Sequence, residues 1–230
     1  MKVKILSYNI HGGRGCDGQR DYQRIGALLK EHDIDIALIQ ELDTRPYREN
    51  TEKAVNELRT DHFDHFIAAP TLVTQEGWYG NAIFSKFPIL KKNIIDISTK
   101  GREPRNILEV FLQSPEGLLH VVNTHKGLKS AERGLQMAKL NDLLSRASDI
   151  PLIVGGDINE WQSSSASLKK LNSVLHELGT GATFPTMLPV FRLDRMWCRP
   201  AGIFRAIKVL KTKQTRQYSD HYPLFAEIEI

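Results

Sequence analysis

Residues 218–223, YSDHYP, stand directly before an apolar stretch that alternates to the last residue of the chain. Apolar side chains at positions 224, 226 and 228 alternate with Phe225 and two glutamates, a period of two that predicts a strand. Asp220 and His221 therefore stand at the mouth of that strand. A histidine can move a proton near pH 7, and a neighbouring carboxylate can raise its basicity or fix its tautomer. Such a triplet alone also fits a surface turn, so its meaning depends on how the other strands end.

Other predicted strands also stop at polar residues. Each of these polar ends follows an apolar run, which suggests that the ends could meet at one edge of the fold. If they converge, the resulting site holds two histidines, several carboxylates and amide oxygens, and no thiolate. The polar ends are Asn9, Glu41, the Asn123–His125 segment, Asp157 with Asn159, Asp194, and Asp220 with His221.

The pattern along the chain alternates strands with helices. A helix is expected after Asp21, which can cap its N-terminus, and residues 35–41 form the nearly continuous apolar run of a strand covered on both faces. Short strands joined by short turns in the middle third predict antiparallel pairing between neighbours. Further strands are expected at 3–8, 63–68, 80–85, 89–97, 106–112, 118–123, 151–154, 193–198, 204–210 and 224–230, and further helices at 51–59, from Ser130, and at 166–175.

Length and composition predict one domain. A chain of 230 residues with 41% apolar content can bury a full core, and it shows no internal repeat, low-complexity tract or linker. Residues 1–230 are therefore expected to form a single catalytic domain of the α/β class. Helices interleaved with strands in both halves favour two packed sheets with helices on the outer faces.

Charge and cysteine usage limit the class of protein. The net charge of +4 and the pI near 9.0 favour an anionic partner slightly. Cys16 and Cys198 have no metal-ligand spacing, which is typical of reduced thiols in a cytosolic protein. Neither a transmembrane stretch nor a signal peptide is expected. The predicted location is the cytoplasm, with peripheral association at a membrane surface as the alternative.

The set of polar strand ends indicates a chemistry. Carboxylates with Asn oxygens suit a hard cation such as Mg²⁺ or Mn²⁺, whereas zinc would more often want clustered His or Cys. A hard cation beside histidines fits phosphoester hydrolysis, in which one group activates water and another protonates the leaving oxygen. Arg102 and Arg105 could both add positive charge around the phosphate.

In motif order, the chain resembles the endonuclease/exonuclease/phosphatase superfamily. The matching pieces are short, but seven of them follow in the family's order between residues 3 and 228. The resemblance implies a four-layer α/β/β/α sandwich, two packed and largely antiparallel sheets flanked by helices, with the site at one rim. The pieces are residues 7–10, 39–41, 80–86, 123–125, 155–159, 192–195 and 219–221.

The resemblance also implies catalytic roles. Asp157 and Asn159 would orient the attacking water and hold the phosphate. His221 would act as general base or transition-state stabiliser, with Asp194 fixing its ring. His125 matches the two-histidine deoxyribonuclease and sphingomyelinase branches, where it would assist the leaving group. The abasic-site branch lacks this histidine, which counts against abasic-site cleavage.

Metal and phosphate contacts are implied in the same way. Asn9 and Glu41 look like ligands of Mg²⁺ or Mn²⁺, and Asp220 looks like a further ligand or a support for one. Arg105 is similar to a phosphate-binding arginine of the family, with Arg102 competing for the role. Asn81 would either contact phosphate or serve the structure.

The substrate stays open between two kinds of phosphodiester. Trp161 and Trp78 could stack on a base, sit at a lipid interface, or simply pack. Residues 192–216 carry eight Lys or Arg and one acid, which suits a polyanion or an anionic membrane surface. The sequence shows no extra hairpin for DNA and no hydrophobic protrusion for a bilayer. Resemblance to small bacterial members, some with relatives linked to phospholipid metabolism, makes a lipid head group a rival to nucleic acid.

The sequence therefore predicts a divalent-metal-dependent phosphodiesterase, either nuclease-like or specific for phospholipid head groups. The alternatives are a phosphomonoesterase of inositol phosphates or similar small molecules, and an inactive binding scaffold. Complete site motifs count against the scaffold. The expected partner is the nucleic acid or anionic lipid substrate, with no stable protein partner and a monomeric state.

Overall fold

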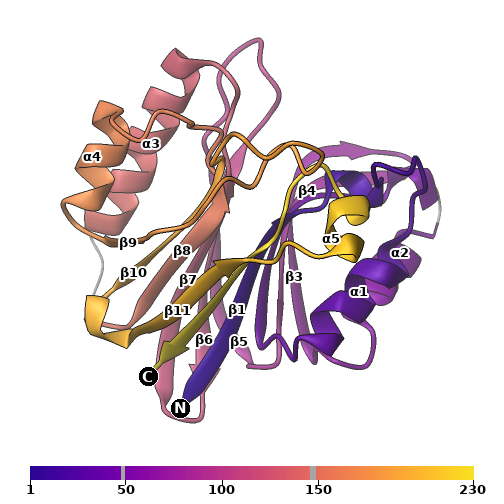
Figure 1. The fold of residues 1–230 in the computed structure, drawn as a ribbon, viewed down its shortest axis with the longest axis horizontal. Helices are drawn as coiled ribbons and strands as arrows, with labels where there is room; N and C mark the ends of the chain where they lie inside the picture. Colours follow the sequence, from indigo (N-terminus) through magenta and orange to yellow (C-terminus); the bar gives the residue numbers. More distant parts are fainter. Residues whose placement is uncertain (48–49, 146–148) are drawn as a thin grey trace.

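The computed structural model describes residues 1–47, 50–145 and 149–230 (Figure 1). The described residues form two six-stranded sheets that pack face to face, with helices on both outer faces. Only β1–β2 and β7–β8 pair in parallel, so the predicted sandwich of two largely antiparallel sheets between helical layers is confirmed.

The first sheet combines the two ends of the chain, and the second sheet is made from its middle. The strand order is β11-β12-β1-β2-β4-β3 in the first sheet and β5-β6-β7-β8-β10-β9 in the second. The bounds in the first sheet are β1 (Lys2–Asn9), β2 (Ile36–Asp43), β3 (His65–Thr74), β4 (Gly77–Ser85), β11 (Phe204–Val209) and β12 (Leu224–Glu229). Those in the second are β5 (Ile89–Asp96), β6 (Asn106–Ser114), β7 (Gly117–His125), β8 (Leu152–Asp157), β9 (His176–Leu178) and β10 (Asp194–Arg199).

Each sheet has its own helical cover. On the right of Figure 1, α1 (Tyr22–Glu31) and α2 (Thr51–Arg59) lie against the first sheet, and on the left α3 (Ser130–Ser145) and α4 (Ala166–Asn172) lie against the second. Asp21 caps α1 as predicted, since its side chain accepts hydrogen bonds from the backbone N–H groups of Gln23 and Arg24. A fifth helix, α5 (Lys213–Tyr218), precedes β12. Short 3₁₀ turns occupy His11–Gly13, Arg45–Tyr47 and Ala201–Ile203.

Residues that face the opposite sheet change from apolar to polar along each central strand. In β1, Val3 and Ile5 belong to the core between the sheets, and period-two alternation places Ser7 and Asn9 on the same inner face. At the boundary, the Gln40 side chain donates hydrogen bonds to Asn123 Oδ1 (2.7 Å) and Ser7 Oγ (3.3 Å). The polar rim beyond this boundary lies opposite the end where the two chain termini pair (Figure 1).

One predicted strand pairing is wrong. Short connections in the middle third predict that β4 pairs with β5, but the two strands belong to different sheets. The turn between them carries the chain across the sandwich, because Ser85 Oγ accepts from the Phe87 N–H and donates to its carbonyl, both at 2.9 Å. The other neighbours in the middle third, β5–β6 and β6–β7, are antiparallel as predicted.

Candidate active site

Four candidate side chains lie at the ends of strands, on the polar rim of the two packed sheets. Asn9, His125 and Asp157 are the last residues of β1, β7 and β8. Asp194 begins β10 and pairs with Asp157 in the antiparallel ladder. All four are almost fully buried. The structure therefore brings these predicted strand ends together at one rim.

Glu41 reaches the same place through an irregularity in β2. The register with β4 shifts between Ile39 and Leu42, and Glu41 lies in this bulge with a φ of 60°. A bulge of this kind redirects a side chain, and a positive φ at a residue other than glycine is conformational strain of the sort that gathers at functional sites. The Glu41 carboxylate accepts a hydrogen bond from Asn9 Nδ2 at 2.9 Å. Asn159, with a φ of 53°, has the same unusual backbone.

The approach of β8 to β7 depends on Gly156. Its φ is 147°, and a Cβ there would lie 1.8 Å from the carbonyl oxygen of Thr124. A larger residue would push the strands apart exactly where His125 and Asp157 pair. Asn159 completes this corner, since its backbone N–H donates to Asp157 Oδ1 (2.9 Å) and its side-chain amide to the Lys126 carbonyl (2.8 Å).

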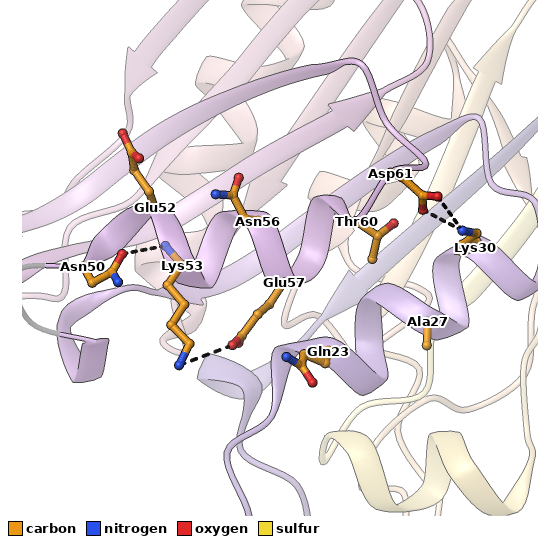
Figure 2. Close-up of a pocket in the computed structure, with 10 residues that line it drawn as sticks. All are labelled: Gln23, Ala27, Lys30, Asn50, Glu52, Lys53, Asn56, Glu57, Thr60 and Asp61. Carbon is orange, nitrogen blue, oxygen red and sulfur yellow. Dashed lines mark hydrogen bonds and ion pairs between the residues drawn. The ribbon is translucent and has the colours of Figure 1, made fainter.

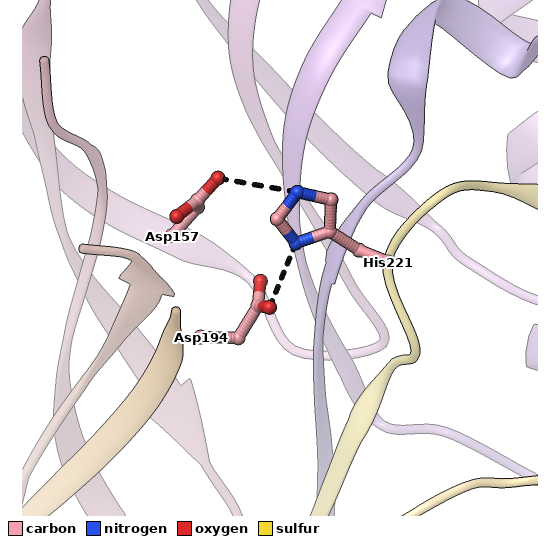
Figure 3. A group of neighbouring side chains, drawn as sticks. All are labelled: Asp157, Asp194 and His221. Atoms are coloured by element: carbon pink, nitrogen blue, oxygen red, sulfur yellow. Dashed lines mark hydrogen bonds and ion pairs between the residues drawn. The ribbon is translucent and has the colours of Figure 1, made fainter. Parts of the chain in front are cut away.

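His221 is held between two carboxylates (Figure 3). Its Nδ1 hydrogen-bonds Asp194 Oδ2 at 2.8 Å, and its Nε2 lies 3.7 Å from Asp157 Oδ2. Burial alone would lower the pKa of His221, but the negative charges of Asp194 and Asp157 raise it to about 10. The ring is therefore a cation at neutral pH, with Nε2–H as its second donor.

The pKa of Asp157 is set mainly by burial. Burial, with a contribution from the charge of Asp194, raises the pKa of Asp157 to about 7 against the opposing effect of His221. Its Oδ2 accepts from Asn9 Nδ2 at 3.0 Å and lies 3.5 Å from His125 Nε2. A carboxyl with such a pKa can take up a proton near neutral pH.

His125 is the neutral histidine of the site. Burial and the positive charges of Arg105 and His221 hold its pKa well below 6.5. Its Nε2 also lies 3.9 Å from Glu41 Oε1. The two histidines therefore differ in charge at neutral pH, which suits them to different tasks.

These groups open onto a cavity of about 890 Å³. Arg105 lines it and pairs with Glu103 at 2.7 Å, whereas Arg102 is not among its lining residues. Asn81 is buried behind the cavity, where its amide donates to Asn106 Oδ1 at 2.9 Å. The lining residues are Glu41, Glu103, Arg105, His125, Leu128, Lys129, Ser130, Arg133, Asp157, Asn159, Trp161, Gln162, Phe184, Phe191, Leu193, Asp220 and His221.

Sequence reasoning missed three neighbours of the site. His11 Nδ1 lies 3.8 Å from Asp220 Oδ1, Glu103 neutralises Arg105, and the Phe184 ring lies 4.8 Å from the His221 ring. His11 follows the predicted ligand Asn9 by only two residues in the sequence, and this short separation could have indicated that His11 lies near the site. Glu103 and Phe184 lie in irregular segments, and nothing in their local pattern indicates the contact.

Two groups of residues fit a metal ion. Asp157, Asp194 and His221 offer ligand atoms within 4.8 Å of one another, and Asp194 Oδ1 is buried without a hydrogen-bond partner. However, the Asp194–His221 hydrogen bond already occupies one ligand atom of each. The predicted group of Asn9, Glu41 and Asp220 would supply oxygen ligands only, although Asn9 Oδ1 already accepts a hydrogen bond from the His11 N–H at 3.1 Å. The pKa of Glu41 is raised by burial and by the charge of Asp220. Carboxylates that are costly to ionise together suit a hard divalent cation.

A second hollow, of about 720 Å³, lies between α1 and α2 (Figure 2). Its charged residues are largely paired with one another, as in the Lys30–Asp61 and Lys53–Glu57 ion pairs. No histidine or cysteine lines it. It is therefore a solvated groove between two helices.

A family model places the chain among known proteins. Residues 6–221 match the Endonuclease/Exonuclease/phosphatase family. The chain belongs to this family. Members of the family act on phosphoester bonds and typically use divalent metals.

Individual relatives do not fix a substrate. The uncharacterized protein YbhP of Escherichia coli (strain K12) is 30% identical over 248 residues, covering 100% of this chain and 97% of YbhP. The mannosyl-6-phosphatase Bt3783 of Bacteroides thetaiotaomicron superposes with a TM-score of 0.79 at 20% identity, covering 99% of this chain and 100% of that one. D. rerio TDP2 complexed with single strand DNA product superposes with a TM-score of 0.75 at 18% identity, covering 100% and 99%. The two structural likenesses show the shared fold.

Proposed function

We propose that this protein hydrolyses phosphodiesters with the help of Mg²⁺ or Mn²⁺. The observation that carries the proposal is the His221 ring, fixed by Asp194 on one side while its other nitrogen faces Asp157 and the cavity. Such a constellation can orient a proton donor and a proton acceptor about one phosphorus atom. The proposal keeps Asp157, Asn159, Asp194, His125 and His221 as the catalytic group.

Asp157 serves as general base in the proposed reaction. Its carboxylate accepts a proton from the attacking water, and the hydrogen bonds from Asn9 and Asn159 hold it in position. The His221 imidazolium donates Nε2–H to a phosphoryl oxygen as negative charge develops there. Asp194 keeps the ring in that orientation, so it is a positioning residue for His221.

The remaining polar groups serve the leaving oxygen and the phosphate. His125, as a neutral imidazole, donates a hydrogen bond to the leaving oxygen, which takes a proton from solvent water as its bond to phosphorus breaks, while Asp157 returns its proton to solvent. Arg105 adds positive charge at the cavity wall. Asn9, Glu41 and Asp220 would hold the cation, which when bound neutralises charge on the phosphoryl group. Asn81 is buried, does not line the cavity and donates to Asn106, and its phosphate contact stays a prediction.

Hydrolysis of bis-p-nitrophenyl phosphate tests the proposal. We expect turnover that EDTA abolishes and Mg²⁺ or Mn²⁺ restores. Asp157→Asn and His221→Ala should each lower kcat/KM by about 10²- to 10⁴-fold, because each removes a proton-transfer or charge-stabilising group. The matched control is His176→Ala, an exposed histidine on β9 away from the cavity. Full activity in either site variant, or in EDTA, contradicts the mechanism.

The same assay distinguishes the second candidate. A monoesterase would cleave p-nitrophenyl phosphate faster than the diester. Arg105, Lys129 and Arg133 line the cavity and could serve a dianionic phosphate, but Arg105 and Arg133 are already paired with Glu103 and Glu160. The paired state of these arginines favours the singly charged diester.

A further inference from the structure

A small hairpin forms one wall of the cavity mouth. Phe184 and Phe191 pair across it, with the Phe184 N–H donating to the Phe191 carbonyl at 3.0 Å and the reverse bond at 2.9 Å. Its tip exposes Met187 by 60%, Leu188 by 71% and Val190 by 60%. The sequence-based expectation that the chain has no hydrophobic protrusion is therefore wrong. The sequence shows no alternation of apolar and polar residues that would predict this hairpin. The residues at its tip do not pair with another strand, so nothing imposes such an alternation on them.

The tip is held firmly although its side chains are uncovered. The Thr186 N–H donates to the Asp220 carbonyl at 2.9 Å, and Thr186 Oγ1 donates to the Ser219 carbonyl at 3.0 Å. Tyr222 adds a hydrogen bond from its hydroxyl to the Thr186 carbonyl at 3.1 Å. The exposed apolar side chains are thus fixed to the segment that carries His221.

Apolar side chains also line the cavity beside the hairpin. Leu128 is 72% exposed and Trp161 56% exposed, and both line the cavity together with Phe191, whose ring lies 6.1 Å from the Trp161 ring. Of twelve large apolar side chains exposed in the described part of the chain, six lie on the hairpin or on this adjoining part of the rim. Such a concentration around a polar opening is typical of a surface that meets another apolar phase.

Positive charge flanks this apolar rim. Arg216 donates to the Met187 carbonyl at 3.4 Å, and with Lys213 it lines a shallow hollow beside Met187. The acid in that hollow, Asp17, is paired with Arg24. Lys129 stands next to Leu128 on the adjoining part of the rim and is exposed. The basic residues of the 192–216 stretch therefore do not all lie beside the rim, because Arg195 and Arg205 form ion pairs elsewhere.

We propose that the Phe184–Phe191 hairpin docks the enzyme on an anionic phospholipid bilayer, and that the substrate is the phosphodiester of a phospholipid head group. Apolar side chains at the tip enter the interface while Lys129, Lys213 and Arg216 meet anionic lipid. The docking places the cavity mouth against the head groups. This inference rests on the proposed phosphodiesterase activity.

Two observations favour lipid over nucleic acid. The side chains at the tip are aliphatic or thioether groups, which offer no π-face on which a base can stack. The exposed side chains of the tip also lie outside the cavity lining, so that a head group can enter the cavity while its acyl chains stay in the bilayer. No helix in the described ranges is long and apolar enough to cross a membrane, and docking at the surface needs none.

Binding is measured first, by sedimentation of the EDTA-treated protein with vesicles of phosphatidylglycerol and phosphatidylcholine. We expect binding that Leu188→Asp weakens about tenfold or more, since it removes a buried Leu from the interface and adds a charge. Leu90→Asp is the matched control, because Leu90 is also exposed, by 59%, but lies on β5 away from the site. It should bind like the unchanged protein. Thermal unfolding checks that both variants are folded.

Hydrolysis then separates this inference from the proposed function. Leu188→Asp should cleave the soluble diester normally but lose most of its rate on vesicles. Turnover of the soluble diester without vesicle binding overturns docking and leaves the phosphodiesterase intact. Vesicle binding that depends on Leu188, with no diester cleaved by any variant, overturns the activity and leaves docking intact. Loss of single-stranded DNA binding in Leu188→Asp, with vesicles ignored, assigns the rim to nucleic acid and overturns the lipid assignment.

Discussion

Two buried histidines of this chain each hydrogen-bond a carboxylate, and only one of them lines the cavity. His120 Nε2 lies 2.7 Å from Glu109 Oε1, and its ring stacks on Phe111 with centroids 4.4 Å apart. His221 makes a similar bond to Asp194 but turns its second nitrogen toward the cavity. A histidine–carboxylate pair is therefore no sign of catalysis by itself. The free nitrogen facing substrate space makes the difference.

Glu109→Gln tests the structural pair. Hydrogen bonds from His120 and Asn93 lower the pKa of Glu109 below 4.5. An acid with a lowered folded pKa adds stability above its unfolded pKa, and this stability is lost as the pH falls through the folded pKa. We expect Glu109→Gln to reduce the free energy of unfolding by about 1–3 kcal/mol at pH 7, measured by urea titration.

The pH dependence of the lost stability distinguishes the charge of Glu109 from its packing. The difference from the unchanged protein should shrink as the pH falls from the unfolded pKa through the lowered folded pKa, because Glu109 then becomes protonated in both states. Glu116→Gln, an exposed glutamate in the β6–β7 turn, should change little at either pH. A loss equal at pH 7 and pH 3.5 would show that packing, and not the charge of Glu109, is responsible.

Residue by residue, sequence patterns foresee which side chains end strands, because alternation with period two fixes the face of each one. Asn9, His125 and Asp157 come to the rim for this reason. Glu41 needs a bulge to reach it, and no pattern in residues 39–42 indicates a bulge. The pattern predicts Glu41 as the polar end of its strand, and only its role as a metal ligand was expected through family resemblance. Local sequence could not foresee the Arg105–Glu103 pair, which depends on how an irregular segment folds back.

Among the elements, the turn between β4 and β5 has the largest effect on topology. Three residues move the chain from one sheet to the other, and Ser85 closes the turn through two hydrogen bonds to Phe87. Strand propensity foresees both strands but not their sheets, since the same alternation fits either one. For similar reasons the sequence patterns did not predict the three-residue β9 or the six-residue α5, in which Thr215 is the buried residue. Neither has enough residues for a period to show.

Ser85→Ala should weaken this crossover. It leaves the partly buried Phe87 N–H without its acceptor, so we expect the free energy of unfolding to fall by about 0.5–1.5 kcal/mol. The turn lies at the far end of β4 from Gly80 and Asn81, so kcat/KM on the soluble diester should stay unchanged. Ser173→Ala removes an exposed hydroxyl at the end of α4 and serves as control. Equal stability in the two variants would show that the Ser85 contacts contribute nothing.

At the scale of the whole molecule, the cavity gathers carboxylates that burial makes costly to ionise. Because burial raises the pKa of Glu41 above 4.5, the folded state binds a proton there more readily than the unfolded state does. The free energy of unfolding therefore falls as the pH rises from the unfolded pKa through the raised folded pKa. A bound cation competes with that proton, so its stabilising effect should be larger at pH 7.5 than at pH 5.

Thermal unfolding with and without Mn²⁺ measures this effect without any substrate. A concentration of 100 times Kd should stabilise the fold by about 2.7 kcal/mol. Glu41→Gln should lose most of that gain, whereas Glu52→Gln, an exposed glutamate of the hollow between α1 and α2, should keep it. An unchanged shift in Glu41→Gln would move the cation to Asp157, Asp194 and His221, the other group that fits one.

The strand order of the first sheet sets the timing of assembly during synthesis. β1 pairs with β12, so the edge of β1 is covered only after β12 has been made and has docked. Pairings this distant in sequence form slowly, and an uncovered edge is open to wrong partners. The residues just before β12 include Asp220 and His221. Closure of this sheet edge and placement of these two side chains at the rim are therefore a single folding event.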